Sequence, residues 1–217
     1  MKKGLITLLA LISLTSMAYA DIVRPEVYCY NKKFGLKLEN TEITKPEYSK
    51  IIKLGDNAWI IQYKHKYGIM NHKGEYIIKP KYRWADRVAQ NLVKLGNDND
   101  YGVYDDKGNI IIPPEYSLIE RISKDFFITC KNYKYGLIDL SGNIVLRNDF
   151  DTIFIPNEGT LVLQYQGEWY KLAIVKEDGI NFEVKPSEEE DGNSLGEIMV
   201  KTSAVSGYTV LTFTDYV

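Results

Sequence analysis

Short runs of β-branched and aromatic residues dominate the hydrophobic pattern of this chain. Residues 77–78 and 109–112 follow glycine turns and stop at a proline, whereas residues 68–70 and 102–104 precede those turns. Each pair of runs predicts two strands joined by a tight hairpin. Apolar residues nowhere recur at helical spacing over three turns. We therefore expect an all-β fold in which helix is scarce.

An aromatic residue followed by glycine recurs about every 34 residues. This column comprises Phe34-Gly35, Tyr67-Gly68, Tyr101-Gly102 and Tyr135-Gly136, with Trp169-Tyr170 at the fifth place. A second column of glycines lies six residues after the glycine of each aromatic-glycine pair and comprises Gly74, Gly108 and Gly142. In the first unit, Asn40 occupies the corresponding position. Glycine and asparagine tolerate positive φ, so a tight turn is expected at each of these positions.

A third column follows in the same phase and completes the unit. It reads Pro46-Glu47-Tyr48, Pro80-Lys81-Tyr82, Pro114-Glu115-Tyr116 and Asn148-Asp149-Phe150. Apolar segments at residues 51–54 and 118–122 come after this column, and segments at 126–129 and 161–163 lead into the next aromatic-glycine pair. Three columns in phase indicate a tandem array of about five β-hairpin repeats of about 34 residues each.

A single unit of this length cannot enclose a hydrophobic core, because an isolated hairpin is marginal in water. Neighbouring units must therefore share their cores, and the rings of the aromatic-glycine column are expected to lie buried between them. In the alternative, Tyr67, Tyr101, Tyr135 and Trp169 line a groove that stacks sugars or peptide side chains. The array is expected to be open or superhelical, with a closed propeller-like ring as the alternative.

The combination of aromatic-glycine, turn glycine, Ile/Val run and Pro-x-Tyr resembles the WG-repeat family, also called KWG repeats. Residues 135–145 match the pattern best, and the likeness covers roughly residues 27 to 175. The tryptophan of the family's name is Phe or Tyr in four units, and Trp169 is followed by Tyr170. The resemblance implies an all-β repeat fold used for binding, with no shared catalytic residues.

The first twenty residues have the pattern of a secretory signal peptide. Lys2 and Lys3 precede an apolar run, and small residues at Ala18 and Ala20 predict cleavage before Asp21. The alternative, a membrane anchor, needs about 20 apolar residues, roughly twice the length of this run. No later stretch is apolar enough to cross a membrane. The repeat array at residues 21–175 is thus expected in the periplasm or outside the cell.

The last part of the chain departs from the repeat pattern. Residues 176–194 are strongly acidic, with Glu188, Glu189, Glu190 and Asp191 in succession. This segment is interpreted as a solvated loop, or alternatively as a negatively charged tongue that meets a basic partner. Residues 195–217 contain two β-like runs that are expected to cap the open edge of the array.

Composition and motifs argue against several functional classes. The net charge of −2 and the pI near 5.8 disfavour a nucleic-acid binder. His65 and His72 are an odd number of residues apart, on opposite faces of a regular strand, so no metal site is expected. The cluster of Asp98, Asp100, Asp105 and Asp106 lacks calcium-loop spacing and is typical of turns. No nucleophile motif or cofactor fingerprint is present.

The two cysteines occupy the same repeat position, three units apart. Cys29 and Cys130 each lie six residues before the glycine of an aromatic-glycine pair. An exported protein with an even cysteine count often oxidises them, but a bridge needs Cα atoms within about 7 Å. A disulfide would therefore require strong coiling of the array or a displaced first strand. The alternative is two separately buried thiols.

These observations predict an exported, non-catalytic β-repeat protein that binds another envelope or extracellular protein, including an immunity-type role against a toxin. The alternative is an envelope glycan-binding module that uses Trp59, Trp84 and Trp169 as stacking platforms. A hydrolase with scattered carboxylates is the third reading, disfavoured because no motif selects a catalytic pair.

Overall fold

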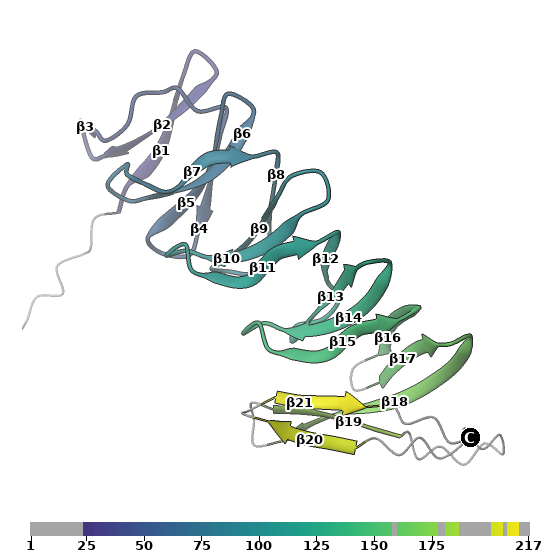
Figure 1. Ribbon diagram of the computed structural model, residues 1–217. Helices are drawn as coiled ribbons and strands as arrows, with labels where there is room; N and C mark the ends of the chain where they lie inside the picture. Colours follow the sequence, from purple (N-terminus) through teal and green to yellow (C-terminus); the bar gives the residue numbers. More distant parts are fainter. Residues whose placement is uncertain (1–23, 158–159, 178–180, 187–200, 206–207, 213–217) are drawn as a thin grey trace, which may run out of the picture.

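A computed structural model describes residues 24–157, 160–177, 181–186, 201–205 and 208–212 of the chain. These residues form strands and connecting turns without a helix, which confirms the all-β prediction (Figure 1). Within this described part, no helix has the length and apolar character needed to cross a membrane.

Five small antiparallel sheets follow one another along the chain. The first has three strands and the next four have four strands each, always in sequence order. The first sheet contains β1 (Glu26–Tyr30), β2 (Lys33–Leu38) and β3 (Thr41–Glu42). The second contains β4 (Lys50–Leu54), β5 (Ala58–Tyr63), β6 (Lys66–Asn71) and β7 (Tyr76–Tyr82). The third contains β8 (Trp84–Arg87), β9 (Leu92–Gly96), β10 (Tyr101–Asp105) and β11 (Ile110–Tyr116).

The remaining strands complete the array and add a separate hairpin. The fourth sheet contains β12 (Leu118–Arg121), β13 (Phe126–Lys131), β14 (Lys134–Asp139) and β15 (Ile144–Phe150). The fifth contains β16 (Thr152–Asn157), β17 (Thr160–Tyr165), β18 (Glu168–Glu177) and β19 (Asn181–Pro186). The strands β20 (Lys201–Val205) and β21 (Tyr208–Thr212) pair with each other, and β21 runs beside β15.

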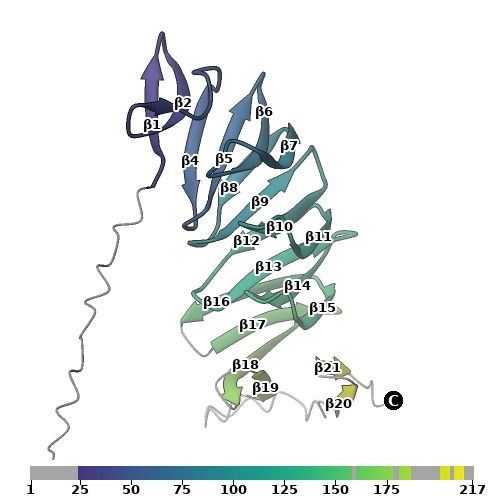
Figure 2. The same cartoon turned by 90° about the vertical axis from the view of Figure 1, so that its left-hand side faces the viewer.

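The array is open. The first and fifth sheets lie at opposite ends of the molecule (Figure 1), and successive sheets are turned relative to one another (Figure 2). The open or superhelical prediction is confirmed, and the closed-ring alternative is not adopted. The second, third and fourth sheets each begin just after one member of the Pro-x-Tyr column and end at the next, so the structural unit is a four-stranded meander.

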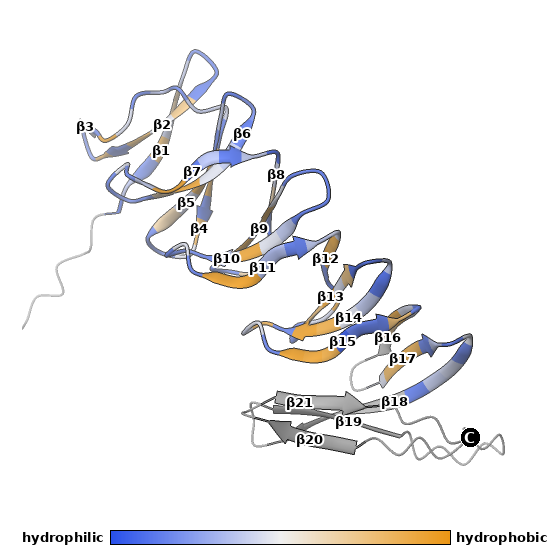
Figure 3. Ribbon diagram, in the orientation of Figure 1, coloured by the Kyte–Doolittle hydropathy of each residue, from blue (hydrophilic) through white to orange (hydrophobic). Residues whose placement is uncertain are grey.

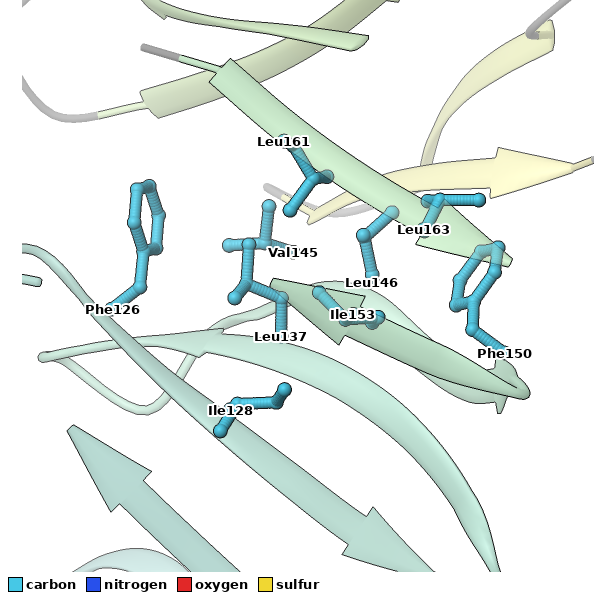
Figure 4. Close-up of a cluster of buried hydrophobic side chains, with 9 residues drawn as sticks. All are labelled: Phe126, Ile128, Leu137, Val145, Leu146, Phe150, Ile153, Leu161 and Leu163. Carbon is cyan, nitrogen blue, oxygen red and sulfur yellow. The ribbon is translucent and has the colours of Figure 1, made fainter. Parts of the chain in front are cut away.

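Hydrophobic cores lie between consecutive sheets, as the marginal stability of a lone hairpin requires. The largest one joins the fourth and fifth sheets and includes Leu137, Phe150 and Leu161 (Figure 4). Three equivalent clusters join the earlier sheets in sequence order. Apolar stretches therefore occupy the middle of the strands, and hydrophilic residues occupy the turns (Figure 3).

The two aromatic columns face each other in the first four units. Cα partners are Tyr67 and Tyr82, Tyr101 and Tyr116, Tyr135 and Phe150, and an isolated bridge joins Phe34 to Tyr48. Within each pair the ring of the Pro-x-Tyr column lies deeper: Tyr48, Tyr82, Tyr116 and Phe150 are all buried.

The expectation that the aromatic-glycine rings form the buried spine is therefore wrong. Phe34, Tyr67, Tyr101 and Tyr135 are only half-buried, and Trp169 is 50% exposed. Tyr67, Tyr101 and Tyr135 pack at the margins of the shared cores, beside the buried members of the clusters.

The glycine of each aromatic-glycine pair admits the backbone of the next strand in its own sheet. Gly68 alone stands opposite residues 79–81, and a β-carbon on it would lie 2.4 Å from the Ile78 carbonyl oxygen. This irregularity is a bulge. The proline within it has no N–H to donate, and a bulge is a place where no such donor is needed for the ladder. Gly102 and Gly136 face the same irregularity in the next two sheets.

The predicted turn glycines have the expected backbone. Gly74, Gly108 and Gly142 have φ of 84°, 85° and 90°. In the first unit, however, Glu39 has the positive φ of 54°, in place of the predicted Asn40. A second set of tight turns, which the sequence did not indicate, joins the two strands before the bulge at Asn31-Lys32, Lys64-His65 and Asn132-Tyr133, all with positive φ.

The C-terminal boundaries differ from the prediction. The strands β18 and β19 continue to Glu177 and Pro186, so the array extends past residue 175, and residues 181–186 belong to a strand rather than to an acidic loop. The strands β20 and β21 lie within residues 195–217, and the expected capping role of that segment stays a prediction. The predicted signal peptide at residues 1–20 and the acidic run Glu188–Asp191 lie outside the described residues.

Candidate binding surface

The first strands of the four-stranded sheets lie along one edge of the array. In Figure 2, β4, β8, β12 and β16 follow its left-hand side, and the last strands β7, β11 and β15 follow the other. Each first strand pairs on one side only within its sheet. Equivalent side chains of these strands therefore form rows along this edge, which we call the first-strand edge.

An aromatic depression of about 290 Å³ opens on the first-strand edge between the third and fourth sheets. Trp84, Tyr101 and Leu118 contribute its apolar lining, and the Trp84 side chain is 59% exposed. Lys94 Nζ lies 5.8 Å from the centre of the Tyr101 ring and donates a hydrogen bond to the Ile119 carbonyl oxygen at 3.0 Å. The ammonium group thus links the third sheet to the fourth at the aromatic depression.

A basic depression of about 580 Å³ lies farther along the same strands. Its cationic lining consists of Lys53, Arg87 and Arg121, which occupy one repeat position with a spacing of 34 residues. Arg87 Nη1 donates to the Lys53 carbonyl oxygen at 3.1 Å, and Arg121 Nη1 donates to the Val88 carbonyl oxygen at 2.8 Å. Each guanidinium therefore reaches back to the preceding unit.

Further contacts fix the Arg121 side chain. Its Nε and Nη2 donate to the carbonyl oxygens of Ser123 at 2.9 Å and Lys124 at 3.0 Å.

Asp56 is the carboxylate in the lining of the basic depression. It accepts from Arg24 Nη1 at 2.7 Å, and its Oδ1 lies 3.7 Å from Lys53 Nζ. Arg87 and Arg121 themselves bond to carbonyl oxygens, which carry no full charge.

The candidate tryptophans do not converge on one site. Trp59 is half-buried against the core between the first and second sheets, whereas Trp84 lines the aromatic depression. Trp169 forms an exposed pair with Phe154 in the fifth sheet, with ring centres 6.2 Å apart. Of the residues proposed from the sequence, the structure brings Trp84 and Tyr101 together.

The basic row is the part of the surface that sequence reasoning missed. Its signal was present, since Lys53, Arg87 and Arg121 stand in phase with the aromatic and glycine columns. The row Lys50, Trp84 and Leu118 has the same spacing, but its members differ in chemistry.

The described residues contain no cluster of three or more His, Cys, Asp or Glu side chains that could hold a metal ion. His65 and His72 are both exposed. Cys29 is an exposed free thiol and Cys130 is a buried free thiol, so the structure does not contain the disulfide considered above.

Asp105, part of the acidic cluster in the sequence, organises a turn. Its Oδ1 accepts from the backbone N–H groups of Lys107 at 2.9 Å and Asn109 at 2.7 Å, and its Oδ2 accepts from Asn109 Nδ2 at 2.8 Å. Partial burial alone would raise the pKa of Asp105, but these hydrogen bonds to the carboxylate outweigh it and lower the pKa below its ordinary value.

Buried tyrosine hydroxyls tie consecutive sheets together. Tyr82 and Tyr104 share a hydrogen bond of 2.8 Å between their hydroxyl groups, and their rings lie 5.8 Å apart. Burial first, and then the Tyr82 hydroxyl, raises the pKa of Tyr104 above its ordinary range. The Tyr104 hydroxyl therefore stays protonated at neutral pH, and its hydrogen bond with Tyr82 is a structural contact.

Fold and surface together define a tandem β-sheet repeat protein in which each unit completes its neighbour's core. The family model described as "WG containing repeat" matches residues 67–94, 101–135 and 135–179. The chain belongs to the WG-repeat family, as the aromatic-glycine and Pro-x-Tyr columns indicated.

Other comparisons add little to this assignment. No curated protein matches the chain. Among solved structures, that of Kluyveromyces lactis Hsv2p is similar over 74% of this chain and 61% of that chain, with 12% sequence identity and a TM-score of 0.37. The aligned part is therefore about three fifths of that protein's length.

Proposed function

We propose that this chain is an exported, non-catalytic protein that binds another envelope or extracellular protein through its first-strand edge. The observation that carries the proposal is Trp84, whose large ring is 59% exposed at the rim of an apolar depression. Exposed aromatic residues beside apolar pockets are typical of protein interfaces, where they supply much of the binding energy.

The construction of the array supports this role. The shared cores hold the first strands of consecutive sheets rigidly beside each other, so side chains from separate units form one surface without a partner being present. A surface that is ordered in advance loses little conformational entropy on binding. The basic depression farther along the same strands would add charge complementarity, which gives specificity and speeds association.

Position-specific crosslinking tests this proposal. A photoreactive phenylalanine analogue would replace Trp84 in the protein produced in its native cells, and Tyr133, 93% exposed in the turn between β13 and β14, would be replaced as the matched control. We expect one defined protein adduct from position 84 and none from position 133. Equal adducts at both positions, or none at position 84, would contradict the proposal.

An immunity-type role is the narrower form of the same proposal. It predicts that the crosslinked protein is a toxin and that the purified chain, but not its Trp84→Ala variant, blocks the toxin's activity. The Trp84 side chain stands on the surface, so the variant is expected to fold with a free energy of unfolding within about 0.5 kcal/mol of the parent.

Envelope glycan recognition is the second candidate, because an exposed tryptophan beside an apolar depression can also stack on a sugar ring. Co-sedimentation with purified peptidoglycan separates the two functions. Binding to the glycan that is lost in Trp84→Ala, combined with no protein adduct at position 84, would favour the glycan. We expect the protein to remain in the supernatant.

Export is tested independently of binding. The predicted signal peptide would be removed before Asp21, so the protein recovered from the periplasm or the medium should begin at this residue. N-terminal sequencing of that fraction checks the cleavage site. A mature chain that begins at Met1 would contradict export by this route.

A further inference from the structure

The basic depression has the features of a binding site for anions. We propose that Lys53, Arg87 and Arg121 form a row of cations that receives the carboxylate side chains of an acidic segment of the partner protein. This inference rests on the proposed function, since it names the chemistry of the surface that the partner presents. It concerns a part of the first-strand edge distinct from the aromatic depression.

The row is fixed in place before any ligand binds. Arg87 and Arg121 are each anchored to a carbonyl oxygen of the preceding unit, so the repeat itself sets the spacing between the guanidinium groups. A guanidinium has five N–H donors. The contacts described use one donor of Arg87 and three of Arg121, which leaves donors for a ligand on both.

The charge in the depression is not balanced by the protein. Three cationic side chains line it, against the single carboxylate of Asp56. Arg24, outside the lining, already pairs with Asp56 at 2.7 Å, so this carboxylate does little to neutralise Arg87 or Arg121. A second carboxylate, that of Asp106, lies close to Gly55: its Oδ2 is 2.5 Å from the position that a β-carbon on Gly55 would take. Asp106 is not among the residues that line the depression. The net positive charge is local, because the whole chain carries −2.

The lining favours carboxylates of a protein over a nucleic acid. Its remaining members are Gly55, Val88, Ala89 and Gln90, so it offers no aromatic ring for a base to stack on. Two-donor contact from arginine to a carboxylate needs only the planar fork of the guanidinium and no stacking ring.

Fluorescence anisotropy with a labelled twelve-residue peptide of alternating Glu and Ser tests the inference. The same peptide with Gln in place of Glu is the ligand control, and a twelve-nucleotide oligothymidylate is the nucleic-acid control. At low ionic strength we expect the Glu peptide to bind at least about tenfold more tightly than either control. Binding should weaken as salt is added, because the charges are screened.

Four substitutions assign the binding to the row. Arg87→Gln and Lys53→Gln should each weaken Glu-peptide binding by about five- to tenfold, since each removes a charge-assisted contact. Asp56→Asn should strengthen binding about two- to threefold because it removes the opposing charge. Arg147→Gln is the matched control: Arg147 is exposed on β15, at the other edge of the array, and lies 3.6 Å from Asp149. It should leave binding unchanged.

The results separate this inference from the proposed function. Equal binding of the Glu and Gln peptides, unchanged binding by a folded Arg87→Gln variant, or tighter binding of oligothymidylate would each overturn the inference. Circular dichroism confirms that each variant is folded. If any of these results accompanies a protein adduct at position 84, the carboxylate site is rejected while the proposed function is retained.

Discussion

A β-carbon on Gly142 would stand 2.1 Å from the carbonyl oxygen of Ile111 in the preceding sheet. The turn between β14 and β15 therefore touches the backbone of β11 directly. Gly108 and Gly74 approach the preceding unit through side chains instead: a β-carbon on Gly108 would stand 2.6 Å from the Ile77 side chain, and one on Gly74 would stand 2.8 Å from the Thr44 side chain. The glycine column thus serves two purposes: it supplies positive φ in the turn and it forms the joint between consecutive sheets.

Gly142→Ala is expected to destabilise the protein by about 3 kcal/mol. Alanine at a φ of 90° costs about 1–2 kcal/mol, and displacing a backbone carbonyl costs a similar amount. Chemical denaturation monitored by circular dichroism measures the change in the free energy of unfolding.

Gly167→Ala is the matched control for this joint. Gly167 has a φ of 86°, but no atom lies within 4 Å of its hypothetical β-carbon. Only the backbone cost of about 1–2 kcal/mol should appear. Equal losses in the two variants would mean that the contact with Ile111 contributes nothing.

The turn at Asn71 and Glu75 uses the same bridge as the turn at Asp105 and Asn109, with the amide and the carboxylate exchanged. Asn71 Nδ2 donates to Glu75 Oε2 at 2.8 Å, and Asn71 Oδ1 accepts from the backbone N–H groups of Lys73 and Glu75. We therefore expect the double substitution Asp105→Asn with Asn109→Glu to be tolerated better than either single substitution.

A double-mutant cycle measures this exchange. Asp105→Asn places two amides opposite each other, and Asn109→Glu places two carboxylates opposite each other. Each single substitution should therefore lower the free energy of unfolding by about 1–2 kcal/mol. The double variant should recover about 1 kcal/mol as coupling energy. Additive losses would show that the two side chains act independently of each other.

The carboxylate of Asp105 also predicts a dependence of stability on pH. Its pKa in the folded protein is lowered from 3.8, so its stabilising contribution is complete above that value and is lost as the pH falls through the folded pKa. The difference in unfolding free energy between the parent and Asp105→Asn should thus be constant near neutral pH and shrink below about pH 4. Denaturation at a series of pH values measures it, and a difference that grows on acidification would reverse the sign assigned here.

The cysteines should react at very different rates. Cys29 is exposed and Cys130 is buried, and they are not bonded to each other. A thiol reagent should modify one cysteine in the folded protein and two in denaturant, without prior reduction. Reaction of neither thiol in denaturant would indicate a disulfide, which needs Cα atoms within about 7 Å and so conflicts with an open array.

The period of the repeat, the turn glycines and the shared cores could be predicted from the sequence. Certain backbone conformations require particular residue types, and those residues recur visibly along the chain. Positive φ selects glycine at positions 74, 108 and 142, and the bulge opposite Gly68 accommodates a proline. The turn at Lys64-His65 left no such trace, since it contains no glycine although both residues have positive φ.

Burial within an aromatic pair could not be predicted in the same way. Tyr67 and Tyr82 are cross-strand partners of identical chemistry, and only the packing of the next sheet decides that Tyr82 lies deeper. The strand β19 was missed because its charged neighbours resemble a solvated loop, whereas Asn181–Pro186 forms an edge strand that tolerates charge.

Gly74, Gly108 and Gly142 occupy the same position in consecutive units, so each of these turns contacts the preceding unit at an equivalent place. Excision or duplication of 34 residues in register would keep this repeating contact in phase along the array. Gene-level expansion and contraction can accordingly alter how far the molecule extends, and how many cations its row displays, without inventing a new fold.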